Sequence, residues 1–128
     1  AAGARMPGSG QHPVLPPPET DVDAARASVA RLAALGPQKL AVSHFGLLDD
    51  PEEDLARADE QIATIAEAAR RTAADGADPD ARAIADEMQR SLPLEETVGD
   101  PDMIARWRRL EWRDHCALGL EAWLSRTH

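Results

Sequence analysis

The stretch KLAVSHFG, residues 39–46, decides the fold that we expect for this chain. Its apolar run at 40–42 predicts a short β-strand over 39–43, which leads into a histidine and a Phe-Gly turn. Because a single strand is not stable alone in water, this strand is expected to pair with strands that the chain does not obviously contain. The histidine, His44, is either a packed, hydrogen-bonded side chain or a metal ligand at the rim of a sheet.

Four helices are expected to account for most of the remaining chain. Apolar residues at helical spacing predict a first helix over 21–35, with Thr20 as its N-cap. Three Asp-Pro pairs each place an N-capping residue before a proline in the first helical turn, and they predict helices over 51–75, 79–91 and 101–125. The fold class expected for the chain is therefore mostly α with one short β-strand.

The composition excludes several classes of partner. A formal net charge of −9 argues against nucleic acid and against anionic membrane surfaces, since both need a Lys/Arg footprint. No apolar run approaches the roughly 20 residues of a membrane span, and no signal peptide is visible, so a cytoplasmic location is expected. The single cysteine, Cys116, excludes an internal disulfide and is expected to be a small buried hydrophobe.

The last predicted helix carries two tryptophans in different settings. Trp107 shares a helical face with Leu110 and is expected to be buried, whereas Trp112 lies five residues further on, among charged residues. We therefore expect Trp112 to be exposed and to anchor contact with another domain or subunit. Alanine dominates many of the other core-facing positions, so a self-sufficient core is not expected for much of the chain.

The first 46 residues and the helix after them resemble the C-terminal part of hydrolases with the metallo-β-lactamase fold. The resemblance rests on an ordered set: the loop GARMPGSG, the segment PPPETDVDAARASVARLAAL, the stretch LGPQKLAVSHFG and the acidic helix DDPEEDLARADEQI. It covers roughly residues 1–75. SHFG alone is a weak motif, and the specificity comes from the order of the four elements.

The resemblance implies an αββα sandwich with two metal ions, usually zinc, and a metal-bound hydroxide that attacks the substrate. His44 matches the histidine of the last metal-binding motif. Residues 1–46 would be the C-terminal end of the metallo-β-lactamase-like domain, and residues 47–128 a helical C-terminal region. His12 lies in the Gly- and Pro-rich loop at 1–19, which would border the active-site mouth. It is either a substrate contact or a solvated loop histidine.

The chain also departs from the family pattern. The family's His-x-His-x-Asp-His motif is absent, as is the next histidine motif, and the chain begins just after the place of the metal-bridging aspartate. One imidazole cannot supply a zinc site. We therefore expect a fragment or processed chain that is inactive alone and pairs with the missing N-terminal part of the parent domain. The parent would act on a small-molecule substrate, of a class left open among thioesters, lactones, β-lactams and phosphodiesters, and could be a homo-oligomer.

A different class of function stays open. The chain could be a free-standing α-helical protein-interaction module in which His44 is structural. The apolar seams of the helices predicted at 51–75 and 101–125 favour this alternative, whereas the Pro-rich start and the lone strand favour the hydrolase.

Overall fold

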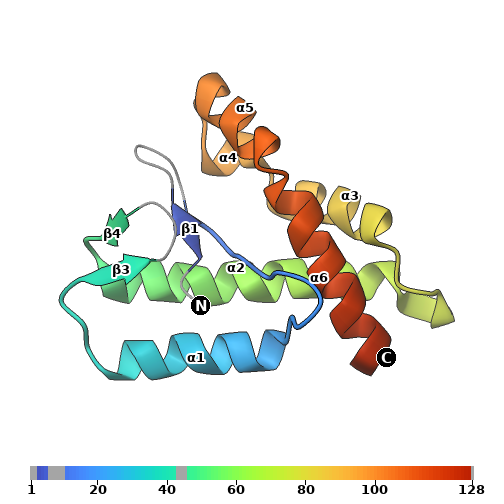
Figure 1. The fold of residues 1–128 in the computed structure, drawn as a ribbon, viewed down its shortest axis with the longest axis horizontal. Helices are drawn as coiled ribbons and strands as arrows, with labels where there is room; N and C mark the ends of the chain where they lie inside the picture. Colours follow the sequence, from blue (N-terminus) through green and yellow to red (C-terminus); the bar gives the residue numbers. More distant parts are fainter. Residues whose placement is uncertain (1–2, 6–10, 43–45, 128) are drawn as a thin grey trace.

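The structure is a computed structural model that describes residues 3–5, 11–42 and 46–127, and these residues are mostly helical (Figure 1). The expected helical fold class is therefore confirmed. The elements in chain order are β1 Ala4–Arg5, β2 Gln11–His12, α1 Val22–Ala34, β3 Leu40–Val42, β4 Gly46–Leu48, α2 Pro51–Thr72, the 3-10 turn Ala74–Gly76, α3 Ala81–Ser91, α4 Leu94–Thr97, α5 Pro101–Arg109 and α6 Trp112–Thr127.

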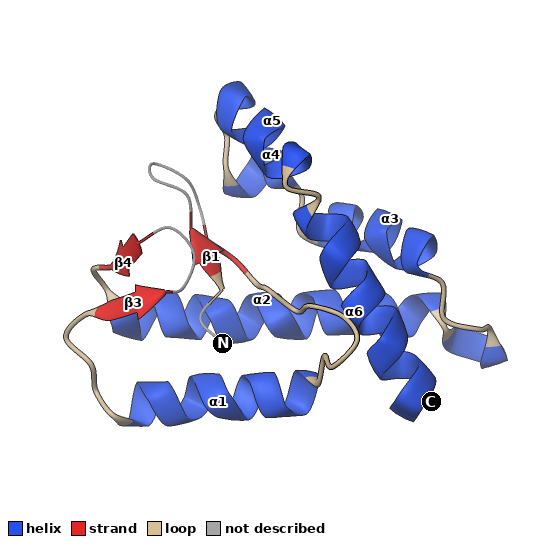
Figure 2. Cartoon of the chain, viewed as in Figure 1, coloured by secondary structure: helices blue, strands red, loops and turns tan. Residues whose placement is uncertain are grey.

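The described residues contain four short strands, in two antiparallel pairs at one end of the molecule (Figure 2). β1 pairs with β2, with Ala4 opposite His12, and β3 pairs with β4, with Leu40 opposite Leu48. The predicted strand at 39–43 is confirmed at 40–42, but the expectation of only one strand is wrong. β3 finds its partner a few residues later in the same chain, because Gly46 and the two leucines after it supply three ladder residues.

Aspartates cap α1, α2, α3 and α5, although not always at the predicted position. Asp50 accepts from the backbone N–H of Glu53 at 3.2 Å, so α2 begins where the sequence predicts. Asp21 caps α1 in place of Thr20, whose hydroxyl donates instead to the carbonyl of Pro16 at 2.7 Å. Asp80 caps α3, so this helix begins after the Asp78-Pro79 pair rather than at it. In each case the side chain satisfies an N–H that the helix leaves unpaired.

The single helix expected over 101–125 is wrong, because α5 ends at Arg109 and α6 begins at Trp112. Glu111, between them, has φ of 51°, a left-handed conformation that is uncommon for a residue with a side chain. The break brings Trp107 and Trp112 to one core, although five residues in a continuous helix would place them on different faces. Burying a second indole outweighs the cost of this backbone conformation, about 1–3 kcal/mol.

The hydrophobic core is built around α2. α2 packs against α1 along one flank and against α3 and α6 along the other (Figure 1). Its predicted seam is confirmed: the five apolar residues that alternate by three and four are each at most 1% exposed, namely Leu55, Ala58, Ile62, Ile65 and Ala69. One continuous cluster of buried residues reaches from Ala4 to Leu124, so both ends of the chain contribute to the same core.

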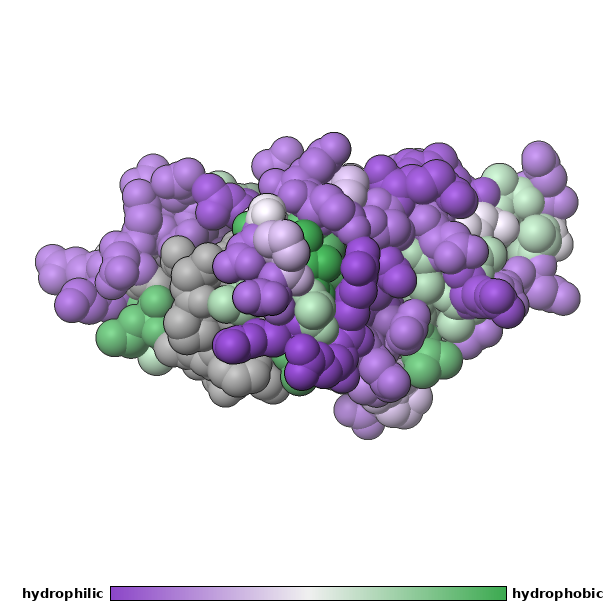
Figure 3. Space-filling view, turned by 90° about the horizontal axis from the view of Figure 1, so that it is seen from above, coloured by the Kyte–Doolittle hydropathy of each residue, from purple (hydrophilic) through white to green (hydrophobic). Residues whose placement is uncertain are grey.

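The surface is mainly hydrophilic, with apolar residues in small separate patches on the face seen in Figure 3. Exposed large hydrophobic residues include Leu35 on the turn after α1, Leu47 on β4, Leu110 at the α5–α6 break and Leu118 on α6. Among the helices in the part of the chain that the structure describes, none combines the length and the apolar character needed to cross a membrane.

Candidate functional site

The N-terminal segment at 13–20 lies along one stripe of α6, far away in sequence. The carbonyl oxygen of Pro13 accepts hydrogen bonds from the indole N–H of Trp112 and, at 3.4 Å, from the thiol of Cys116. Near the other end of α6, the guanidinium of Arg126 donates to the carbonyl oxygens of Pro18, at 2.6 Å, and Thr20. The segment therefore runs parallel to the helix and is fixed at both ends.

Gly119 allows this close approach between the segment and the helix. A Cβ at this position would collide with the carbonyl oxygen of Leu15 and with the hydroxyl oxygen of Thr20. Only a residue without a side chain fits there. Gly119 follows Cys116 by three residues and Trp112 by seven, so all three lie on the same face of α6.

His12 is the most enclosed polar residue of the site, with 0% of its surface exposed. Its ring centroid lies 4.6 Å from that of Trp107 and 4.7 Å from that of Trp112. Its Nε2 lies 3.4 Å from the hydroxyl of Thr97, and its Nδ1 has no hydrogen-bond partner among the described residues. The interpretation of His12 as a solvated loop histidine is therefore wrong, because two indoles cover it.

Burial sets the charge of both His12 and Cys116. Desolvation lowers the pKa of His12 from 6.5 to about 4, so the imidazole is neutral at pH 7. Desolvation also raises the pKa of the Cys116 thiol from 9.0 to about 11, against a weaker opposing backbone hydrogen bond. Cys116 is 2% exposed, which confirms that it is a buried hydrophobe. A neutral, enclosed thiol is a poor nucleophile.

The burial of the two tryptophans was predicted correctly for Trp107 and wrongly for Trp112. Trp107 is 2% exposed, which confirms its predicted burial. Trp112 is only 7% exposed, so the expectation that it faces solvent is wrong. Its ring packs against that of Trp107, with centroids 6.2 Å apart, and its indole N–H donates to the carbonyl oxygen of Pro13. In this structure Trp112 anchors the N-terminal segment of its own chain.

An apolar cavity of about 300 Å³ opens between the segment at 14–17 and the α5–α6 break. Trp107, Trp112 and Cys116 form part of its wall. Leu110, 45% exposed, and His115, also exposed, lie on it as well. The same indoles that enclose His12 also shape a space large enough for a small ligand.

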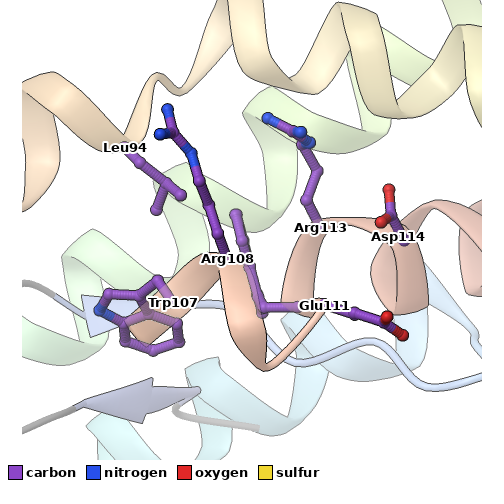
Figure 4. A pocket seen from close by; sticks show the side chains of 7 residues that line it. Leu94, Trp107, Arg108, Glu111, Arg113 and Asp114 are labelled. Atoms are coloured by element: carbon purple, nitrogen blue, oxygen red, sulfur yellow. The ribbon is translucent and has the colours of Figure 1, made fainter. Parts of the chain in front are cut away.

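A smaller cavity of about 190 Å³ also borders both indoles and is lined by charged side chains (Figure 4). Arg108 donates to Glu95 at 2.6 Å, and Arg113 donates to Gln89 at 2.6 Å. Gln89 in turn donates to Glu95 at 2.7 Å. The carboxylate of Glu95 compensates the charge of Arg108, so the network holds α3, α4, α5 and α6 together rather than forming an open anion site.

The family resemblance implies a metal-ligand role for His44, and residues 43–45 lie outside the described residues. Within the described ranges, no group of three or more His, Cys, Asp or Glu side chains is placed to hold a metal ion. Comparisons with protein-family models, with curated proteins and with solved structures find no match to this chain.

Sequence reasoning missed three residues of this site: Gly119, Arg126 and Thr97. Gly119 had a weak signal, because a glycine inside a helical pattern costs about 1 kcal/mol relative to alanine and so marks a position where packing can require it. Arg126 and Thr97 had none, because each acts on a segment about 85 or more positions away in the chain.

Proposed function

We propose that this chain is part of a metal-dependent hydrolase of the metallo-β-lactamase superfamily. In this proposal His44 is one metal ligand, and the loop at 1–19, which contains His12, borders the entrance to the active site. One structural observation supports the proposal most: each sheet in the described residues has only two strands. Two-stranded sheets are marginal alone, and their open edges offer backbone donors and acceptors to further strands, as an αββα sandwich requires.

The position of His44 in the chain also supports this proposal. β3 ends at Val42 and β4 begins at Gly46, and these two residues are paired. In sequence, His44 therefore lies between two paired strands, and the long helix α2 follows the second of them. A strand end is a position from which a side chain can reach a cleft at the rim of a sheet.

The hydrogen bonds that hold the N-terminal segment against α6 support the assignment of that segment to an entrance. A border of an active site works best when its backbone is held in place. Trp112 and Cys116 hold Pro13, and Arg126 holds Pro18 and Thr20, as described above. The role of the helical region 47–128 in this proposal is to fix the segment.

The residues of this chain do not fit a complete two-zinc site. The described residues hold no cluster of three ligands, and His44 by itself supplies one nitrogen. The other ligands would have to come from residues outside this sequence. When bound, zinc would supply Lewis acidity.

The coding sequence immediately upstream of the codon for Ala1 tests this proposal. We expect it to encode a Gly-Asp pair next to Ala1, and a His-x-His-x-Asp-His motif further upstream. An initiator codon directly before the codon for Ala1 would overturn the proposal.

The second candidate is a free-standing helical interaction module with a structural His44. It is favoured by the continuous core from Ala4 to Leu124, which uses both ends of the chain. It is also favoured by Leu35, an apolar side chain that is 79% exposed and available to a partner. Under this alternative, replacement of His44 changes stability and leaves metal content unchanged.

A further inference from the structure

The cavity of about 300 Å³ beside the α5–α6 break has walls from two distant parts of the chain. Val14 and Leu15 come from the N-terminal segment, while Trp107 and Trp112 come from the helices. Hydrogen bonds and the close approach at Gly119 fix these walls relative to each other. The cavity is thus a built feature of the fold, because it depends on the same contacts that position the segment.

Two buried polar groups lie in the wall of the cavity, and neither of them provides a charge or an unused hydrogen-bond donor. The indole N–H of Trp112 and the thiol of Cys116 both donate to the carbonyl of Pro13. The raised pKa of Cys116, about 11, keeps its sulfur uncharged. A charged group placed against the buried part of this wall, away from His115, would lose its hydration without gaining a partner, which costs several kcal/mol.

The exposed side of the cavity carries one apolar side chain, Leu110, and one imidazole, His115. Leu110 follows the last residue of α5 and is 45% exposed, because the backbone turns away at Glu111. Leu118 has a similar exposure of 43% on α6 but does not line the cavity. Leu110 therefore lines the cavity, and Leu118, of similar exposure, is a matched control position away from it.

We propose that this cavity binds a neutral small molecule through an alkyl chain or an aromatic ring. Its volume lies at the lower end of the range of ligand pockets, about 300–1,000 Å³. It has room for about ten groups of the size of a water molecule, at about 30 Å³ each, so a chain of about eight carbons fits. This inference goes beyond the proposed hydrolase and does not depend on it.

The test uses the full chain with Trp123→Phe, so that the remaining tryptophans, Trp107 and Trp112, both line the cavity. The probe is 8-bromo-1-octanol, whose bromine quenches a tryptophan on contact. We expect saturable quenching that unbrominated 1-octanol reverses by competition. Quenching that rises linearly without saturation, as random collisions give, would overturn the proposal.

Two variants in that background locate the binding. Leu110→Asp places a carboxylate at the mouth and removes an apolar contact, so we expect the affinity for the probe to fall about tenfold or more. Leu118→Asp makes the same change at similar exposure on the surface and should leave the affinity unchanged. Equal affinity in both variants would overturn the location. Octanoate should compete less well than 1-octanol, and tighter binding of octanoate would overturn the neutral ligand class.

Discussion

The indole N–H of Trp112 donates a hydrogen bond to the carbonyl oxygen of Pro13, 99 positions earlier in the chain. This contact joins the N-terminal segment at 13–20 to α6, the last helix. It explains why the helix predicted over 101–125 is broken. A continuous helix would have pointed Trp112 away from Trp107, whereas the break at Glu111 lets both indoles cover His12. The N-terminal segment and the break in the helix therefore depend on each other.

We expect the stability of the protein to fall between pH 6.5 and pH 4 because of His12. Burial lowers its pKa to about 4 in the folded state, against 6.5 when it is exposed, so the unfolded chain binds more protons in this window. The effect of His12 on the free energy of unfolding is therefore most favourable above pH 6.5. As the pH falls towards 4, the free energy of unfolding drops by about 3 kcal/mol.

Urea unfolding of the wild type and of His12→Phe at pH 7 and pH 4.5 measures this effect. The phenylalanine does not titrate, so the variant should gain stability relative to the wild type at pH 4.5. Carboxylates titrate in both proteins and cancel in the comparison. The same pH dependence in both proteins would show that His12 is not buried as a neutral ring.

Gly119→Ala is expected to destabilise the protein by about 1–3 kcal/mol through overpacking. The sign is informative, because alanine in an exposed helix interior is favoured over glycine by about 1 kcal/mol. Here the added methyl group meets the carbonyl of Leu15 and the hydroxyl of Thr20. Thermal unfolding gives the comparison, with the exposed Leu118→Ala as control. A stabilised Gly119→Ala protein would mean that the segment does not lie on α6.

The two tryptophans should differ in what their replacement removes. Trp107→Ala empties a core position and should cost about 3–5 kcal/mol. Trp112→Phe keeps a ring but removes the donor to Pro13, and should cost about 1–3 kcal/mol. Chemical denaturation measures both. Acrylamide should quench neither residue efficiently in single-tryptophan variants, and ready quenching of Trp112 would place it outside the core.

The isolated chain is expected to show no hydrolase activity with zinc or manganese, because the described residues form no metal-ligand cluster. Ester, lactone and phosphodiester substrates, each assayed with both metals, check this expectation. Metal-dependent turnover by a pure preparation would show that the chain contains a complete site.

Local patterns predicted the parts of the fold that local forces decide. α2 follows from its cap at Asp50 and from an apolar seam such as Leu55 and Ile62, and both signals lie within the helix. The break at Glu111 could not be predicted, because its cause is the burial of Trp112 against a segment at the other end of the chain. β4 was missed because three residues are too few for a periodic pattern.

The candidate site was less accessible than the fold. His12 follows a Gly-rich stretch and precedes a proline, and such a setting is typical of a solvated loop. Nothing near it in sequence indicates that Trp107 and Trp112 will cover it. Cys116 was predicted correctly, since its apolar helical neighbours already imply burial.

The role of His44 is tested most directly by the zinc content of the protein translated from the whole open reading frame that contains this sequence. Purified wild type, His44→Ala and His115→Ala are compared by elemental analysis, with circular dichroism to verify that each is folded. His115 is the control because it is an exposed histidine with no proposed ligand role. We predict bound zinc in the wild type and in His115→Ala, and a loss of zinc in a folded His44→Ala protein. Zinc content that is unchanged in His44→Ala, or absent from the wild type, would contradict the assignment of this chain to a metal-dependent hydrolase.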